Sequence, residues 1–446
     1  MAKELNARGA KVLLSDSQVP KRAEEIRREL EPLGVEIEVG GHSDKVSGSD
    51  LIVVSPGVSV FNPLLQKALH SGVKVMGEVE IAWRLSPDPF VAVTGTNGKS
   101  TTVTLIDRML GGRSILAGNI GTPLVAEVAR APKDGYVVAE ISSFQLETVC
   151  DFAPHVAVLT NFTTDHLDRH KDMQEYYAAK ARLFARMGPK DLAIFSADDE
   201  GAARMCGQLR QGALPAWIPE YPAPACPACP RIMTFSARGE VENGAWFKDG
   251  WLYYRDGGLV ERLFRWDFPG LPGPHNLANA LAAVAAARSL GVSALECEAA
   301  LRAHQPLHHR LQLVRERDGV IYVDDSKGTN PDAVIAAMRS YDRPVVLIAG
   351  GKDKGVDVSE MMRVMAERVK HLVLIGEAAD RFASEAEKAG VAAVSRCASL
   401  REAVREAARL AEPGDAVILS PACSSFDMFN NAEERGDFFV KYVLEL

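Results

Sequence analysis

The stretch Phe90–Thr102, FVAVTGTNGKSTT, has the residue types and spacing of a phosphate-binding loop. An apolar strand over Phe90–Val93 is followed by a glycine-rich turn, and a helix is expected to begin near Lys99. Backbone N–H groups and a lysine at a helix N-terminus attract phosphate, and the Ser100 hydroxyl is placed as an Mg²⁺ ligand. We therefore predict nucleotide binding, with Lys99 in an exposed turn. Val93 stands where the complete pattern has a glycine, so an ordinary glycine turn is the alternative.

Two potential metal ligands follow neighbouring predicted strands. Glu140 comes directly after the apolar run Tyr136–Ala139 of one strand, and Asp165 and His166 come after the next strand. In a parallel sheet that includes the nucleotide strand, these positions lie near one carboxyl edge, beside Lys99 and Ser100. We predict that Glu140 and His166 hold Mg²⁺, although Mg²⁺ prefers oxygen ligands. A hydrogen-bonded loop histidine is the alternative for His166.

Lys180 lies within a predicted amphipathic helix over Asp172–Met187. Its apolar face at i, i+3, i+4 spacing consists of Met173, Tyr176, Tyr177, Leu183, Phe184 and Met187. An ammonium group in the middle of that face is costly, so Lys180 should be paired, deprotonated or chemically altered. The alternative is a lysine that snorkels from the edge of the face.

An alanine-rich helix is predicted over Leu271–Gly291, with Asn276 and Asn279 on one side of its first turns. These two amides could hold a polar ligand or cap the helix. Arg310 follows the next domain junction and could reach a phosphate across an interdomain cleft.

Three further loops with lysines and hydroxyls end predicted strands near the C-terminus, at residues 325–330, 350–355 and 420–426. Together they predict a pocket for an anionic small molecule. Solvated loop charges are the alternative for each loop taken alone.

Short apolar runs alternate with helical patterns along most of the chain, which predicts α/β architecture with mostly parallel sheets. The expected strands are residues 11–15, 51–55, 73–76, 90–93, 136–141, 155–161, 191–196, 320–324, 345–349, 372–375 and 416–420. A helix is expected over Lys21–Leu33, and the glycine-rich, aromatic stretch Arg231–Phe268 predicts small antiparallel strands. We predict three α/β domains, over residues 1–84, 85–305 and 306–446.

Composition sets outer limits on function. The 446 residues carry a net charge of −8, which disfavours a nucleic-acid partner. No apolar run is long enough to span a membrane, and Met1–Ala10 has no signal-peptide core, so a cytoplasmic protein is expected. The seven cysteines are scattered and are expected to be reduced thiols. Cys226 and Cys229 have metal-ligand spacing without a second pair, which favours a surface loop over zinc.

Several motifs resemble those of the Mur ligases, ATP-dependent amide-forming enzymes of peptidoglycan precursor synthesis. The similar stretches are TGTNGKST at 94–101, GNIG at 118–121, EISSFQLE at 140–147, DHLD at 165–168, HNLAN at 275–279 and HR at 309–310. Three C-terminal stretches resemble the D-glutamate-adding branch of the family: DSKGTN at 325–330, GGKDKG at 350–355 and SPACSSFDMFNNAEERG at 420–436. The resemblance covers nearly the whole chain.

The resemblance implies a Rossmann-like N-terminal domain, a central P-loop ATPase-like domain with a mostly parallel sheet, and a Rossmann-like C-terminal domain. It implies catalytic roles for Lys99, His166 and Lys180. It implies ATP contacts by Thr96, Asn97, Gly98, Lys99, Ser100, Thr101, Asn276, Asn279, Arg310 and Asp325. Two Mg²⁺ ions are expected on Ser100, Glu140, His166 and Lys180, the lysine being a carbamate in that family.

For the substrates, the resemblance implies UDP-N-acetylmuramoyl-L-alanine and D-glutamate, joined through an acyl phosphate by a monomeric enzyme. Asp16, Ser17 and Gly57 would lie near the uridine, and Asn119, Ser142 and Gln145 near the muramoyl-alanine arm. The residues expected to receive D-glutamate are Lys327, Thr329, Lys354, Ser425 and Phe426.

Two positions depart from the family pattern. The first strand and glycine-rich uridine loop of the family are expected before Met1, and Ala432 stands where an aromatic residue is usual. A ligase that adds another amino acid is one alternative function. A non-catalytic nucleotide-binding regulator is another, and it would bind ATP without substrate-dependent release of ADP.

Overall fold

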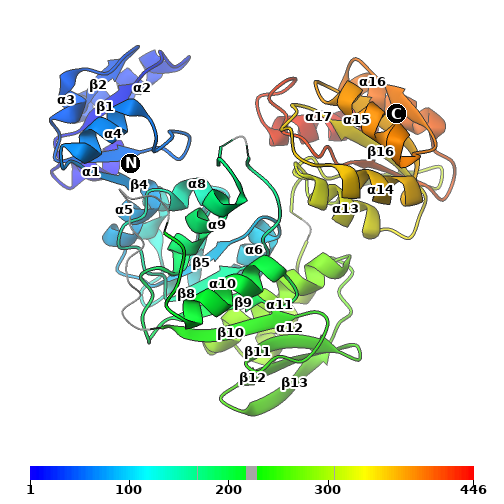
Figure 1. Ribbon diagram of the computed structural model, residues 1–446, viewed down its shortest axis with the longest axis horizontal. Helices are drawn as coiled ribbons and strands as arrows, with labels where there is room; N and C mark the ends of the chain where they lie inside the picture. Colours follow the sequence, from blue (N-terminus) through cyan, green and yellow to red (C-terminus); the bar gives the residue numbers. More distant parts are fainter. Residues whose placement is uncertain (168, 217–228, 306) are drawn as a thin grey trace.

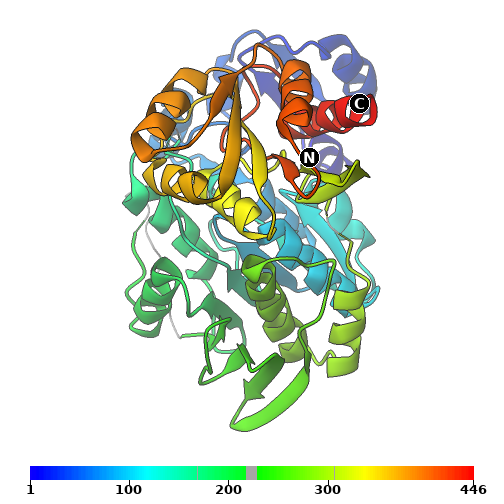
Figure 2. The same ribbon diagram turned by 90° about the vertical axis from the view of Figure 1, so that its right-hand side faces the viewer.

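The computed structural model describes residues 1–167, 169–216, 229–305 and 307–446, so Asp168 and Cys226 of the sequence motifs lie outside the described residues. Figure 1 shows an N-terminal part, a larger central part and a C-terminal part, and Figure 2 shows the same arrangement from the side. Both smaller parts lie at the end of the central part that is opposite the hairpin of β12 (Trp251–Asp256) and β13 (Leu259–Arg265). The fold is α/β, as the sequence predicted.

The N-terminal part contains two parallel strand pairs, β1–β2 and β3–β4. Its elements are α1 (Ala2–Ala7), β1 (Leu13–Asp16), α2 (Ala23–Leu30), η1 (Glu31–Leu33), β2 (Glu36–Val39), α3 (Asp44–Ser47), β3 (Leu51–Val54), α4 (Pro63–His70), β4 (Lys74–Gly77) and α5 (Glu78–Leu85). The expected strands and helix are present, together with β2, which the sequence analysis missed. Within the described residues, β1 and β3 are not paired with each other, so the strands do not form one sheet.

The central part is a nine-stranded sheet in the order β13-β12-β11-β10-β9-β8-β5-β7-β6. Its strands are β5 (Phe90–Thr94), β6 (Ser114–Gly118), β7 (Tyr136–Glu140), β8 (Val156–Leu159), β9 (Leu192–Ser196), β10 (Arg231–Ser236), β11 (Gly244–Lys248), β12 (Trp251–Asp256) and β13 (Leu259–Arg265). The pairs from β6 to β11 are parallel, and β11–β12 and β12–β13 are antiparallel. The prediction of small antiparallel strands over Arg231–Phe268 is correct for the pairs among β11, β12 and β13 and wrong for β10, which is parallel to both of its neighbours and extends the main sheet.

Helices cover both faces of the central sheet, which explains why β5, β8 and β9 are apolar on both sides. One face packs on α6 (Lys99–Leu110) and on the alanine-rich α11 (Pro274–Ser289), and the other packs on α9 (Met173–Ala181). The remaining elements are α7 (Leu124–Glu127), η2 (Val128–Arg130), α8 (Ser143–Leu146), η3 (Arg182–Phe184), α10 (Glu200–Arg210) and α12 (Ala294–Arg302). The helix predicted to reach Met187 ends at Ala181 and continues as the 3₁₀ turn η3.

The C-terminal part is a six-stranded sheet in the order β14-β15-β19-β16-β17-β18, parallel except for β14. Its elements are β14 (Gln312–Arg317), β15 (Val320–Asp324), α13 (Pro331–Arg339), β16 (Val345–Gly350), α14 (Ser359–Arg368), β17 (Val369–Ile375), α15 (Ala379–Ala389), β18 (Val394–Arg396), α16 (Leu400–Leu410), β19 (Ala416–Leu419) and α17 (Ala432–Leu444). In the described part of the chain, no helix is both long and apolar enough to cross a membrane.

Candidate active site

The loop between β5 and α6 has the shape that its glycines allow. Gly95 and Gly98 both have positive φ, at 146° and 82°. A Cβ atom on Gly95 would lie 2.0 Å from Thr160 Oγ1, and one on Gly98 would lie 2.1 Å from Asn279 Oδ1. Only glycine fits these positions without displacing the neighbours. The N-terminus of α6 has no side-chain cap. Its first backbone N–H groups are therefore not bonded by a capping side chain, as a phosphate site at a helix N-terminus requires.

The Lys99 side chain helps to hold this loop. Its Nζ atom donates hydrogen bonds to the carbonyl oxygens of Gly95, at 3.0 Å, and Thr96, at 2.7 Å. Burial lowers the pKa of Lys99, and the Glu140 carboxylate opposes that effect. The expectation of a lysine exposed in the turn is wrong, because Lys99 is half-buried and bound by backbone carbonyls.

A cavity of about 570 Å³ lies beside the loop, and it has the size of a nucleotide pocket. The predicted ATP residues that line it are Asn97, Gly98, Thr101, Asn276, Asn279, Arg310 and Asp325, whereas Thr96, Lys99 and Ser100 do not line it. The side chains of Asn276 and Asn279 are hydrogen-bonded to each other at 3.2 Å. They do not cap α11, because Gly273 is the N-cap residue. The capping alternative is therefore wrong.

Arg310 and Asp325 extend the cavity wall with residues from the C-terminal part of the chain. Arg310 Nη2 donates a hydrogen bond of 3.1 Å to Ser100 Oγ, and its buried Nε atom has no partner. Asp325 accepts a hydrogen bond of 2.7 Å from Ser420 Oγ. Burial raises the pKa of Asp325 to about 7, against the effects of the Ser420 hydrogen bond and the Arg310 charge.

The Glu140 carboxylate has one oxygen available for a cation. Oε1 accepts a hydrogen bond of 2.7 Å from Asn119 Nδ2, whereas Oε2 is buried and has no hydrogen-bond partner. An unpaired carboxylate oxygen away from water is unfavourable unless something positive binds it. Glu140 interacts electrostatically with both Lys99 and Lys180.

Lys180 is buried and does not snorkel to the surface, since only 1% of it is exposed. Its Nζ atom donates a hydrogen bond of 2.9 Å to Gly95 O and lies 4.6 Å from the centre of the Tyr176 ring. Burial holds the pKa of Lys180 well below its usual value, and the charge of Lys99 acts in the same direction. Lys180 therefore contacts the loop that also carries Lys99.

His166 adjoins a junction between the central and C-terminal parts. Burial lowers the pKa of His166 to about 4, so the imidazole is neutral near pH 7. The neighbouring Asp165 forms an ion pair of 3.1 Å with Lys354, and its second oxygen accepts a hydrogen bond of 3.1 Å from Asn330. Asn330 also donates to Asn97 Oδ1 at 3.0 Å. The loop that follows β8 in the central part thus contacts loops of the C-terminal part through Asp165.

Asp165 and Asn330 had no assigned role in the sequence analysis. Asn330 precedes Pro331, which is typical of a helix cap, and its Oδ1 does cap α13 by accepting from Ala333 N. The same side chain reaches across to the central part through its amide nitrogen. That second contact has no signature in the local sequence.

The residues expected near the muramoyl-alanine arm lie at the ends of β6 and β7. Ser142 and Gln145 form the capping box of α8, so their side chains bond each other's backbone. The Asn119 side chain donates its hydrogen bond to Glu140 Oε1. None of these three side chains lines the cavity.

The residues expected near uridine belong to the N-terminal part and also lie outside the cavity. Asp16 accepts a hydrogen bond from Gln18 N, and Ser17 is exposed. Gly57 O accepts a hydrogen bond of 3.2 Å from Arg169, a residue of the central part that the sequence analysis missed.

The residues expected to receive D-glutamate are spread over three loops. Lys327 pairs with Glu433 at 2.9 Å, and the Thr329 carbonyl oxygen accepts a hydrogen bond of 3.0 Å from Lys354. Ser425 Oγ is buried without a partner, and Phe426 is largely exposed. Ala432 begins α17, and its carbonyl oxygen accepts a hydrogen bond from Ser326.

Comparison with known proteins identifies the class that this fold and site define. Residues 93–217 match the Mur ligase middle domain, residues 309–423 match the Mur ligase glutamate ligase domain, and residues 1–77 match the MurD-like N-terminal domain. The chain belongs to the Mur ligase family.

Relatives within the family are similar over almost the full chain. A protein of Pelotomaculum thermopropionicum named UDP-N-acetylmuramoylalanine--D-glutamate ligase is 45% identical over 98% of this chain and 93% of its own length. A protein of the same name from Caldanaerobacter subterraneus subsp. tengcongensis is 39% identical over 98% of this chain and 94% of its own length.

Solved structures of other Mur ligases share the fold. MurF from Acinetobacter baumannii has a TM-score of 0.63 at 18% identity, over 99% of this chain and 92% of that one. MurC from Thermotoga maritima has a TM-score of 0.58 at 18% identity, over 100% of this chain and 96% of that one.

Proposed function

We propose that this protein is an ATP-dependent ligase that joins D-glutamate to UDP-N-acetylmuramoyl-L-alanine in peptidoglycan precursor synthesis. The observation that carries the proposal is the convergence of the phosphate loop, the Glu140–Lys180 region and the ion pair that joins Asp165 of the central part to Lys354 of the C-terminal part. The choice of D-glutamate rests on the relatives of that name, which match nearly the whole chain. Because one chain supplies all of these groups, we propose a monomer, and we place it in the cytoplasm, where ATP is available.

The reaction would have two steps. The L-alanyl carboxylate attacks the γ-phosphorus of ATP, which forms an acyl phosphate and releases ADP. The amine of D-glutamate then attacks the acyl carbon, so that an amide forms, phosphate leaves and the amine loses a proton. Lys99 and the N-terminal N–H groups of α6 would stabilise charge on the phosphoryl group as it is transferred. Lys354 would pair with a substrate carboxylate.

The residues around Glu140 fit a magnesium site. The unpaired, buried Glu140 Oε2 is an oxygen ligand without a partner, and the neutral His166 can add a nitrogen ligand. We propose that Ser100, Glu140, His166 and a Lys180 carbamate hold two Mg²⁺ ions. When bound, these ions would neutralise charge on the phosphate oxygens.

A Lys180 carbamate agrees with the surroundings of that side chain. Burial disfavours an ammonium group, and the lowered pKa supplies the neutral amine that reacts with CO₂. The product, a lysine N-carboxylate plus one proton, provides two oxygens in place of a positive charge.

A coupled assay of ADP release tests the proposed function. The purified chain is given ATP, Mg²⁺ and UDP-N-acetylmuramoyl-L-alanine, with D-glutamate, L-glutamate, L-lysine or meso-diaminopimelate in separate reactions. ADP release is expected only with D-glutamate. Faster release with another amino acid would assign a different ligase activity, and ATP binding without substrate-dependent ADP release would favour a nucleotide-binding regulator.

A further inference from the structure

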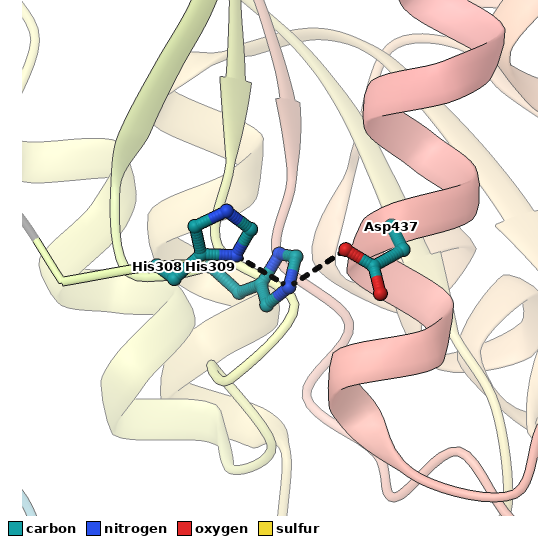
Figure 3. Close-up of side chains that lie close together, drawn as sticks. All are labelled: His308, His309 and Asp437. Atoms are coloured by element: carbon teal, nitrogen blue, oxygen red, sulfur yellow. Dashed lines mark hydrogen bonds and ion pairs between the residues drawn. The ribbon is translucent and has the colours of Figure 1, made fainter.

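Three potential metal ligands meet where the chain enters the C-terminal part, just before β14. Figure 3 shows the rings of His308 and His309 beside the carboxylate of Asp437, which projects from α17. His308 Nδ1 lies 2.8 Å from His309 Nε2, which lies 3.5 Å from Asp437 Oδ1. One ligand atom from each residue lies within 4.8 Å of the other two.

The central ligand of this group is oriented by its neighbours. His309 is 2% exposed, and its Nδ1 atom is hydrogen-bonded to Asp324 Oδ2 at 2.6 Å. With Nδ1 as the donor to that carboxylate, the lone pair of Nε2 points at His308 and Asp437. A carboxylate behind a histidine ring is the usual support of a histidine metal ligand, because it fixes the tautomer and raises the basicity of the free nitrogen.

Gly436 allows α17 to approach the His309 ring. A Cβ atom at position 436 would lie 2.1 Å from His309 Nδ1, so no other residue fits there without moving the helix or the ring. This close approach places Asp437, the next residue, at the Nε2 side of the ring. His308 and Asp437 are exposed, so an ion can reach them from solvent.

We propose that His308, His309 and Asp437 form a binding site for a divalent transition metal ion. Zn²⁺ serves as the reference ion for the geometry. Two imidazole nitrogens and one carboxylate suit Zn²⁺, Co²⁺ or Ni²⁺ and are a poor set for Mg²⁺. Ligand bonds of about 2.0 to 2.1 Å in a tetrahedral site separate ligand atoms by about 3.3 Å. The observed separations of 2.8 and 3.5 Å lie on either side of that value.

Metal binding requires only a local rearrangement. With His309 Nδ1 as the donor to Asp324, the lone pair of His309 Nε2 is the acceptor in the hydrogen bond between the two histidines, and His308 Nδ1 is the donor. A change of tautomer that moves the His308 proton to its other nitrogen would free Nδ1 to bind the ion, without release of a proton. The ion would join residues 308–309 to α17. His309 directly precedes Arg310, whose guanidinium contacts Ser100.

Cobalt binding tests this site. The full chain is titrated with Co²⁺ in excess Mg²⁺, and binding is followed by the visible d–d absorption that imidazole ligation produces. The wild-type chain is expected to bind one Co²⁺ with this band. His308→Asn and Asp437→Asn, which alter exposed side chains, should each weaken the binding by more than about 100-fold, a larger loss than the roughly 10- to 100-fold that removal of a supporting residue causes.

His155→Asn is the matched control, because His155 also faces a carboxylate, Asp191 at 3.4 Å, but belongs to no group of three potential metal ligands among the described residues. This variant should bind Co²⁺ as the wild type does. Equal Co²⁺ binding and equal spectra in the wild type, His308→Asn and Asp437→Asn would overturn the proposal. Absence of the band in the wild type would overturn it as well.

Discussion

Lys354 and Asp165 form an ion pair across the junction of the central and C-terminal parts, with 3.1 Å between Nζ and Oδ1 and less than a tenth of either side chain exposed. Burial opposes ionisation of Asp165, but the neighbouring His166 and Lys354 and the hydrogen bond from Asn330 hold its pKa at about 2. Because this pKa is below the usual value, the Asp165 carboxylate is fully ionised above about pH 4, and its contribution is lost only as the pH falls toward 2.

Replacing Lys354 should weaken D-glutamate binding. A charge-assisted hydrogen bond to a carboxylate contributes about 2 kcal/mol, so Lys354→Met should raise the KM for D-glutamate about 30-fold. The KM for ATP should change much less. Both values come from the ADP-release assay, and Lys352→Met, at an exposed lysine two residues earlier, is the control. An unchanged KM for D-glutamate would exclude Lys354 from the amino-acid site.

The same pair predicts the pH dependence of amino-acid binding. Since Asp165 titrates near pH 2, its charge is constant between pH 6 and 9. The KM for D-glutamate of the wild-type chain should therefore show no inflection from this carboxylate. An inflection between pH 6 and 7 that disappears in Asp165→Asn would contradict the assignment.

Glu140→Gln should change the Mg²⁺ requirement of the reaction. The amide keeps an oxygen that can accept from Asn119 but lacks the charge that a cation needs. We expect the Mg²⁺ concentration for half-maximal activity to rise about tenfold or more. Glu127→Gln is the control, because Glu127 pairs with Arg130 at the end of α7. A Glu140→Gln variant with the Mg²⁺ dependence of the wild type would remove Glu140 from the metal site.

Lys99→Ala should abolish most turnover. One donor that stabilises charge in a transition state contributes about 100- to 1000-fold to kcat. The structure adds a second expectation, because Lys99 also binds the carbonyls of Gly95 and Thr96. The variant should therefore melt a few degrees lower than Lys133→Ala, a change at an exposed lysine. ADP release at the wild-type rate from folded Lys99→Ala would disprove the role of the phosphate loop.

The parts of the site that could be predicted from the sequence depend on local chemistry and on sheet geometry. The loop at Lys99 has a local signature, and parallel strands bring the loops after β5, β7 and β8 to one edge. These two facts suffice to place Glu140 near Lys99. The four strands that the sequence analysis missed, β2, β6, β14 and β18, each lie at the end of a sheet. With one partner strand and more exposure, they carry a weaker apolar pattern.

The contacts between parts of the chain could not be predicted in this way. Asn330 and Asp165 are 165 residues apart, and each has an ordinary local role, as a helix cap and as a loop carboxylate. Nothing in either segment specifies the other. The hydrogen bonds of Lys99 to its own loop were missed for a related reason, since they depend on the path of the backbone around Gly95.

The last prediction concerns Lys180. Carbamate formation needs the neutral amine, and the lowered pKa makes that form available at lower pH than for an ordinary lysine. Activity in CO₂-depleted buffer should therefore fall and should return when bicarbonate is added. The recovery should be greater at pH 8 than at pH 6, because protonation of the amine opposes the reaction.

Substitution separates this chemistry from a structural role of the side chain. Lys180→Ala should lose about 100-fold in kcat, because it lacks the oxygens proposed for Mg²⁺. Short carboxylates such as formate or acetate should restore part of that loss, since they can supply oxygens in the space left by the lysine. Lys190→Ala, at an exposed lysine before β9, is the control and should respond to neither bicarbonate nor acetate. If Lys180→Arg kept near-normal turnover in CO₂-depleted buffer, the carbamate would be excluded, because a guanidinium group does not form one under these conditions.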